Sequence, residues 1–364
     1  MMSTLFQPIT IGNFSVRNRF VRSATQDWLG HSDGSISDEE ISLYRSLAAG
    51  GVGLIITAHS YVVHPVGRAS IRQNGIYDDR FIPGYSRLVD AVHAEGSAIV
   101  LQIAHAGRQT SPELTEGETA LSPSAVTDSV SGITPRAMTE EEIWQTIDAF
   151  AAAISRAKHS GCDGAQLHIA HGYLLSQFIS PYTNRREDTW GGSLENRTRI
   201  LREIIARGRR AVGNNYPILA KLNSTDGFQG EGYLTQADVV ATAKTLEAAG
   251  VAAIEISGGI REAKGVMSPP GINRPEQEAC FAGTARAVKK AVSIPIILVG
   301  ALRSLSVMKE VVGSGAADMV AMSRPFIKEP DLVNRLQSGQ EKVTCVSCNA
   351  CFNPAGLRCY LEKK

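Results

Sequence analysis

The sequence has no excess of either charge and no long hydrophobic run. Lys and Arg number 37 against 36 Asp and Glu, which gives a formal net charge of +1 at pH 7. Neither nucleic acid nor a membrane surface is therefore expected as a partner held by bulk charge. No stretch approaches the roughly 18 apolar residues of a membrane-spanning helix, and residues 1–14 lack the basic and then apolar pattern of a secretory leader. We expect a soluble, cytoplasmic protein.

Cysteine is scarce, with six residues in 364, which is too few for a disulfide framework. No linker rich in Pro, Gly or Ser divides the chain either. We therefore predict one large domain over residues 1–340, followed by a short C-terminal extension over residues 341–364. That extension holds four of the six cysteines, namely Cys345, Cys348, Cys351 and Cys359.

A helix-type pattern that ends in glycine and runs into a short apolar stretch recurs along the chain. It is present at residues 47–56, 159–167, 247–256 and 312–319. Glycine ends a helix in the left-handed conformation, and the apolar stretch is typical of a strand buried on both faces. Helix and buried strand in alternation indicate parallel β-α-β units.

Eight candidate strands alternate with eight candidate helices. This count is typical of an α/β protein with a (β/α)8 TIM barrel, whereas a doubly wound open sheet of this size usually has fewer strands and often a second domain. We predict the barrel. The predicted strands are residues 19–23, 52–57, 98–103, 164–168, 217–222, 252–257, 295–299 and 318–322. The predicted helices lie near residues 38–49, 81–95, 140–160, 196–212, 235–249, 275–291, 303–314 and 329–338.

Two segments fall outside this repeat. Residues 6–18 are typical of a hairpin that turns at Gly12 and Asn13, and this N-terminal hairpin could close the bottom of the barrel. Residues 107–138 contain Gly, Pro, Ser and Thr throughout, which indicates a long loop after the third strand. Long loops of this kind lie on the face where barrel active sites are built.

Catalytic side chains in such barrels come from the carboxyl ends of the strands. The residues at those ends are polar, partly basic and without paired carboxylates. In strand order they are Ser23, Ala24, Thr25 and Gln26; Ala58 and His59; Gln102 and His105; His168, His171 and Tyr173; Lys221; Ser257; Gly300; and Ser323 with Arg324.

The ends of the last two strands suggest a phosphate site. Glycine and other small residues let backbone N–H groups approach a phosphate, and Arg324 can add a charge-assisted hydrogen bond beside the start of the following helix. The alternative is that Gly300 forms a tight turn and Arg324 an ion pair at the surface.

The two histidines His168 and His171 admit three interpretations. They could be metal ligands, but zinc motifs on helices usually have the pattern HExxH, which is absent here. They could instead donate hydrogen bonds to a substrate carbonyl or anion. The third interpretation is that both are structural residues.

One long run of residues resembles a known family. HIAHGYLL at residues 168–175 is followed by QFISP at 177–181, NRR at 184–186 and GGSLENR at 191–197. This run strongly resembles the Old Yellow Enzyme family of NADH:flavin oxidoreductases. Further pieces fall in the family's order over nearly the whole of residues 5–340: residues 5–6 and 18–19, residues 102–108, Gly300, and Ser323 with Arg324.

The resemblance implies an FMN-containing barrel that takes hydride from NAD(P)H and passes it to an activated alkene. Lys221 would face the N1 and C2-carbonyl region of the flavin, where a cation stabilises the negative charge of the reduced ring. Gln102 would bond the pyrimidine ring. The segment Ser23, Ala24 and Thr25 would lie along the flavin edge, and Gly300, Ser323 and Arg324 would hold the FMN phosphate.

The catalytic residues implied by the resemblance are His168, His171 and Tyr173. The two histidines would donate to the carbonyl oxygen of an α,β-unsaturated substrate, and Tyr173 would protonate the α-carbon. The alternative for Tyr173 is a buried ring with a satisfied hydroxyl. Many family members have Pro-Met or Pro-Leu-Thr where this chain has Ser23, Ala24 and Thr25. Trp28 stands where some bacterial relatives have a tyrosine that contacts substrate, so it is a candidate substrate residue.

The cysteine spacing of the extension, Cys345-x2-Cys348-x2-Cys351-x7-Cys359, is compatible with a tetrathiolate site for zinc or a 4Fe–4S cluster. Its place after the barrel is similar to that in the 2,4-dienoyl-CoA reductase branch, although the later spacings are shorter here. The alternative is a set of reduced thiols that pack over the barrel or a neighbouring subunit.

Taken together, the sequence predicts an FMN-dependent enzyme that reduces the C=C bond of a small-molecule enone with NAD(P)H. A homo-oligomer is expected. One alternative is a flavin dehydrogenase or demethylase with the same fold, which would transfer hydride from the substrate to the flavin. The other is a flavin-free, metal-dependent hydrolase or lyase that uses the histidines and the phosphate site.

Overall fold

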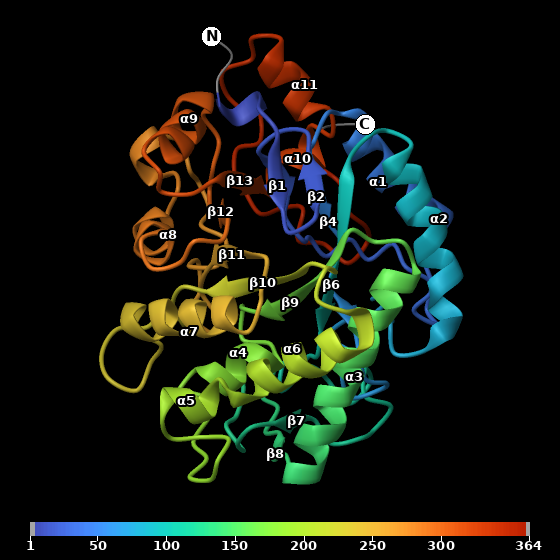
Figure 1. The fold of residues 1–364 in the computed structure, drawn as a ribbon, viewed down its shortest axis with the longest axis vertical. Helices are drawn as coiled ribbons and strands as arrows, with labels where there is room; N and C mark the ends of the chain where they lie inside the picture. The colour runs from blue at the N-terminus through green and yellow to red at the C-terminus, as the bar shows by residue number, and fades with distance from the viewer. Residues whose placement is uncertain (1–3, 362–364) are drawn as a thin grey trace.

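The computed structural model describes residues 4–361, which build a closed barrel of 8 parallel strands (Figure 1). Each strand pairs with the next along the chain, and the last pairs with the first through Ala321 opposite Val21. The predicted (β/α)8 barrel is therefore confirmed, and every predicted strand overlaps one that is present. The barrel strands are β3 (Phe20–Arg22), β4 (Leu54–Ile56), β6 (Ala98–Ala104), β9 (Gly164–Ile169), β10 (Ile218–Asn223), β11 (Ala253–Ser257), β12 (Ile296–Val299) and β13 (Met319–Met322).

Helices surround the strands, with α1 and α2 on one side of the barrel and α7, α8 and α9 on the other (Figure 1). Local signals fix where the longest of them begins, because Thr139 and Glu142 form a reciprocal capping box at the start of α3. The helices are α1 (Asp38–Ala49), α2 (Ile82–His93), α3 (Glu140–His159), α4 (Leu174–Ile179), α5 (Leu194–Arg197), α6 (Arg199–Val212), α7 (Gln236–Ala248), α8 (Ala282–Lys289), α9 (Leu305–Gly313), α10 (Arg324–Lys328) and α11 (Leu332–Gln337). Short 3-10 turns are η1 (Thr4–Phe6), η2 (Asp79–Phe81) and η3 (Pro275–Gln277).

The helix predicted over residues 275–291 is too long, since α8 begins only at Ala282. Residues Pro275–Gln277 form a 3-10 turn instead. The side chain of Glu278 then accepts hydrogen bonds from the backbone N–H groups of Arg303 and Ser304, at 2.6 and 2.7 Å. This contact with a distant segment holds the chain in an extended conformation where a helix was expected.

The hydrophobic core has two layers. One lies between the barrel and its helices, and the other fills the barrel interior with residues such as Leu54, Leu219 and Met319. The interior layer includes Ile11 and Val16 of the antiparallel hairpin β1 (Ile9–Ile11) and β2 (Phe14–Val16). The hairpin therefore closes the barrel at the end where the strands begin, as the sequence predicts.

The opposite end, where the strands finish, is covered by the long loops. The predicted excursion over residues 107–138 contains two short paired strands, β7 (Leu121–Ser122) and β8 (Arg136–Ala137). A buried ion pair between Arg108 and Glu262 ties the loop after β6 to the loop after β11. A short strand β5 (Ser60–Tyr61) also pairs with β6 at this end.

The C-terminal extension packs against the barrel. The backbone N–H of Val343 donates to the carbonyl of Arg303 over 2.9 Å. Further on, the side chain of Asn349 donates to the carbonyl of Ser268, also over 2.9 Å. The extension is thus fastened to the segments after β11 and β12. Among the described residues, no helix has the length and apolarity to cross a bilayer.

Candidate active site

A buried polar layer crosses the barrel interior near the ends of the strands. Lys221 on β10 donates to the Ser23 hydroxyl over 2.7 Å and forms an ion pair with Glu255 on β11 over 3.3 Å. Gln166 on β9 donates to Glu255, and Gln102 on β6 donates to Gln166 over 2.6 Å. Side chains of neighbouring strands therefore fix the Lys221 ammonium and the Gln102 amide in place.

A cavity of about 470 Å³ opens above this layer, a size typical of small-molecule and cofactor sites. The residues that line it come from the ends of most barrel strands. They include nearly all the barrel residues predicted from the sequence, namely Ser23, Ala24, Thr25, Trp28, Gln102, His168, His171, Tyr173, Lys221, Ser323 and Arg324. Gly300 lines an adjoining pocket that shares Ser323 and Arg324 with the cavity.

The two predicted histidines and the predicted tyrosine lie together. The rings of His168 and His171 are 5.1 Å apart at 86°, and the ring of Tyr173 lies 4.9 Å from that of His168. His171 has a positive φ of 62°, a conformation that turns the chain sharply after β9. Its Nε2 atom is 2.7 Å from the hydroxyl of Ser257. The cluster can present imidazole and phenol groups to one ligand.

Both histidines are neutral near pH 7. Burial lowers the pKa of His168 well below its usual value, and the nearby His171 and His59 lower it further. Burial and the positive charge of Lys221 lower the pKa of His171 in the same way. Burial raises the pKa of Tyr173 to about 12. Each imidazole therefore keeps one N–H to donate, and Tyr173 keeps its proton.

His59 joins this cluster, although the sequence places it at the end of the second strand without indicating its role. Its ring lies 5.0 Å from that of Tyr173 and 5.9 Å from that of His168. The side chain lines the cavity, is 6% exposed, and its Nε2 atom has no hydrogen-bond partner among the described residues. Burial lowers the pKa of His59 to about 4. His59 is thus a third neutral imidazole in the cavity.

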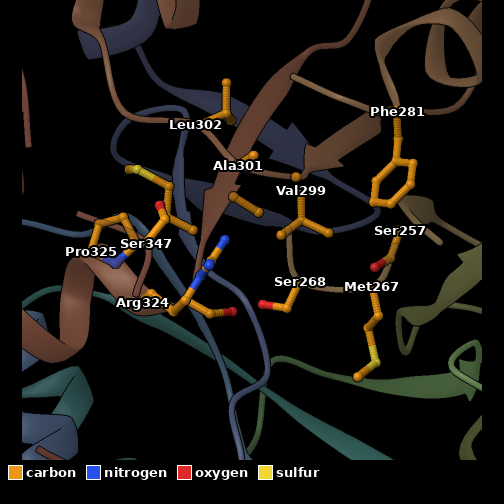
Figure 2. A pocket seen from close by; sticks show the side chains of 14 residues that line it. Ser257, Met267, Ser268, Phe281, Val299, Ala301, Leu302, Arg324, Pro325 and Ser347 are labelled. Atoms are coloured by element: carbon orange, nitrogen blue, oxygen red, sulfur yellow. The ribbon is translucent and has the colours of Figure 1, made fainter. Parts of the chain in front are cut away.

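The predicted phosphate site is a pocket between the ends of β12 and β13. Figure 2 shows Arg324 and Ser347 on one side of it and Ser257 and Phe281 on the other. Gly300 lines it with φ of 152°, and a Cβ atom there would lie 2.9 Å from both Cys280 and Phe281. Only glycine fits this close approach without displacing a neighbour. The glycine predicted from the sequence therefore has a steric reason to be there.

Arg324 has contacts that the sequence does not indicate. Its guanidinium donates to the carbonyl of Pro269 over 2.9 Å and to the Asn349 side chain over 2.6 Å. Asn349 belongs to the C-terminal extension, and Phe352 of the same segment lines the main cavity. The extension is therefore part of the site wall, and Arg324 is not the surface ion-pair residue of the alternative interpretation.

The predicted metal site in the extension is not supported. Cys345, Cys348, Cys351 and Cys359 line one small pocket together with Arg324. Among the described residues, however, no group of three or more His, Cys, Asp or Glu side chains is arranged to hold a metal ion. All four are free thiols, and burial raises the pKa of Cys345 and of Cys351. The described thiols do not fit a zinc ion or a cluster as they stand.

The cavity fits FMN by its own chemistry. The fixed Lys221 ammonium and Gln102 amide lie at its base, and the pocket walled by Gly300 and Arg324 adjoins it through shared residues. Two buried imidazole nitrogens, Nε2 of His59 and Nδ1 of His168, are unpartnered, which is costly unless a ligand meets them. A long ligand with a polar ring at one end and a phosphate at the other meets these requirements.

A barrel with a polar cavity at the ends of its strands, a buried lysine and a pair of neutral histidines is compatible with a cofactor-dependent enzyme. Residues 4–342 match the NADH:flavin oxidoreductase / NADH oxidase family, and the chain belongs to that family. The resemblance to the Old Yellow Enzyme family, which the sequence predicts, is therefore confirmed. This membership conflicts with the alternative of a flavin-free hydrolase or lyase.

Similar proteins include an NADH oxidase of Thermoanaerobacter brockii, 40% identical over 95% of this chain and 52% of that protein. An NADPH dehydrogenase of Bacillus subtilis is 34% identical over 91% of this chain and 93% of its own length. A solved complex of 2-naphthoyl-CoA reductase with 2-naphthoyl-CoA has a TM-score of 0.89 at 33% identity, and covers 96% of this chain and 54% of that one. The chain thus spans about half the length of the first of these relatives and nearly all of the second.

Proposed function

We propose that this enzyme reduces the C=C bond of α,β-unsaturated carbonyl compounds with hydride from NAD(P)H. FMN, when bound, would supply the hydride transfer between NAD(P)H and the alkene. In this proposal Gly300, Ser323 and Arg324 hold the FMN phosphate, and Lys221 with Gln102 meets the polar edge of the ring. Ser23, Ala24 and Thr25 lie along the flavin edge, and Trp28 contacts substrate.

The residues of this chain supply the remaining steps. His168 and His171 donate N–H groups to the carbonyl oxygen, which draws electrons from the alkene and makes the β-carbon electrophilic. Tyr173 gives its phenolic proton to the α-carbon, where negative charge develops once hydride arrives at the β-carbon. The tyrosinate regains its proton from solvent after product leaves.

The single observation that carries the proposal is the charge of the cavity wall. None of the described residues that line the cavity is Asp or Glu, while neutral imidazoles and a protonated tyrosine lie together in its wall. Such a site suits a carbonyl, which accepts hydrogen bonds. An amine substrate of a dehydrogenase or demethylase is a cation and would call for a carboxylate or an aromatic cage.

Separate measurement of the two half-reactions tests the proposal. The flavin is first reduced with NADH or NADPH without oxygen, and cyclohex-2-enone is then mixed in while the flavin absorbance is followed. The proposal expects rapid reoxidation with one equivalent of cyclohexanone formed. In a parallel experiment, oxidised enzyme mixed with N-methyl amines should stay oxidised. Reduction of the flavin by an amine, with no reoxidation by enones, would assign the chain to the dehydrogenase alternative.

A further inference from the structure

Arg261 lies at the cavity wall on the loop after β11, and the proposed chemistry does not use it. Its side chain lines the cavity that also contains Tyr173, and the residue is exposed. The positive charge of Arg261 lowers the pKa of Tyr173, opposing the larger effect of burial. Within residues 4–361, no hydrogen bond or ion pair engages the Arg261 side chain.

The backbone on both sides of Arg261 is fixed. The N–H of Ile260 donates to the carbonyl of Asp226 over 3.2 Å, and Ile260 is buried. On the other side, the Glu262 carboxylate is buried and takes bonds from Arg108, from the Tyr182 hydroxyl and from the backbone of Ser129. Arg261 is therefore a free cation on a rigid base, which reduces the entropy lost when it binds a partner.

The other two cations of the cavity are already engaged. Lys221 forms its ion pair with Glu255 at the base, and Arg324 donates to Pro269 and Asn349 beside the phosphate pocket. With no Asp or Glu among the described lining residues, the positive charge of Arg261 has no counter-charge on the cavity wall. A planar guanidinium in this setting matches a carboxylate, which it can bind through two parallel hydrogen bonds.

We propose that Arg261 binds a carboxylate on the substrate, so that the preferred substrates are α,β-unsaturated carbonyl compounds that carry an acid group. This inference rests on the proposed function and adds a substrate class to it. The carbonyl lies at the histidines and the carboxylate at Arg261. Arg261 is here a specificity-determining residue, so its role is measured as the preference for an acid over the matching neutral compound.

The test compares 3-benzoylacrylate with its methyl ester, which share the enone and differ in charge. The ratio of their kcat/KM values, acid over ester, should fall about ten- to hundredfold in Arg261→Gln, as expected for the loss of a hydrogen bond between charged groups. The fall should be smaller in Arg261→Lys, which keeps the charge but cannot form the two parallel hydrogen bonds. Lys264→Gln is the matched control, because Lys264 is an exposed cation on the same loop that does not line the cavity.

A binding measurement separates this inference from the proposed function, because it needs no turnover. The flavin absorbance change is titrated with 4-hydroxybenzoate and with 4-hydroxybenzamide. A preference for the anion that disappears in Arg261→Gln supports the inference even if no enone is reduced, in which case only the proposed function fails. The inference would be overturned if Arg261→Gln kept both the wild-type kcat/KM ratio of acid to ester and the wild-type preference for 4-hydroxybenzoate. A loss confined to NADH or NADPH binding would also overturn it, by assigning Arg261 to the co-substrate.

Discussion

Arg324 donates a hydrogen bond of 2.6 Å to Asn349, and this bond joins the phosphate pocket to the C-terminal extension. Arg324 follows the last barrel strand, whereas Asn349 lies among the cysteines of the extension. The extension also contributes Phe352 to the main cavity and Ser347 to the phosphate pocket. The predicted C-terminal extension is therefore part of the cavity wall, and changes within it are expected to affect binding of the cofactor.

Replacing Arg324 with Gln should weaken FMN binding about ten- to hundredfold, because a charge-assisted bond to phosphate is lost. Asn349→Ala should give a smaller loss, since it removes only the anchor of the guanidinium. The dissociation constant is measured by titrating apoprotein with FMN and following flavin fluorescence. Arg335→Gln is the control, because Arg335 lies on α11 in an exposed pair with Asp331. Full affinity in Arg324→Gln would contradict the phosphate role.

Tyr173→Phe should slow reoxidation of the reduced flavin by an enone by roughly 10²–10⁴-fold, the usual contribution of a positioned general acid. Reduction of the flavin by NAD(P)H needs no such proton and should keep its rate. Stopped-flow absorbance reports both half-reactions. Tyr182→Phe serves as the control, because its hydroxyl bonds Glu262 rather than lining the cavity. Equal rates in Tyr173→Phe and wild type would assign the acid to another group.

Replacing His168 and His171 together with Ala should weaken binding of phenol-type carbonyl mimics by about ten- to a hundredfold, as expected for two lost hydrogen bonds. Ser257→Ala should have a smaller effect, since it removes only the partner of His171. The affinity is obtained from the change in flavin absorbance on titration. His93→Asn, on the outer surface, is the control. Unaltered affinity in the double variant would remove the carbonyl role from this pair.

Stability should fall as pH decreases from 6.5 to 4, because buried neutral histidines take up protons only on unfolding. Burial lowers the pKa of His59 in the folded protein to about 4. The free energy of unfolding that depends on His59 is therefore at its full value above pH 6.5 and falls as pH decreases toward 4. One such histidine accounts for about 3 kcal/mol over this window. Denaturant unfolding of His59→Asn at several pH values should give a shallower dependence than wild type.

Asp27 has the opposite effect on the pH dependence of stability. The difference between variant and wild type is therefore more informative than the stability curve of either protein alone. Burial raises the pKa of Asp27 to about 6, which makes its contribution largest at low pH and lost as pH rises through 6. The difference between His59→Asn and wild type cancels this effect. His31→Asn, at an exposed site, is the control. A pH dependence in His59→Asn as steep as in wild type would show that His59 is not held neutral by burial.

The barrel could be predicted because its signals are local. A glycine that ends a helix and an apolar run that follows it lie within about ten residues of each other, and this pattern marks four of the eight strands. The positions of Lys221, Gln102 and the histidines follow from the strands, since side chains at strand ends converge in a closed barrel. For the same reason Gly300, Ser323 and Arg324 could be placed in one pocket before any contact was known.

The remaining features depend on contacts between distant segments. Glu278 lies within the helix predicted over residues 275–291 but is not helical. Its side chain accepts hydrogen bonds from the backbone of Arg303 and Ser304 instead. Likewise, the sequence places His59 at the end of a strand but does not show that its ring lies beside the ring of Tyr173. The position of the extension in the cavity wall also depends on the hydrogen bond between Arg324 and Asn349, which are 25 residues apart in the chain. No local pattern encodes such pairs.

The fate of the hydride tests the central claim most directly. The enzyme is incubated without oxygen with an enone and with NADPH or NADH that carries deuterium at both C4 positions, and the product is analysed by NMR. The account predicts one deuterium at the β-carbon and a hydrogen from solvent at the α-carbon, delivered through Tyr173. An unreduced enone, or a product without deuterium at the β-carbon, would contradict it.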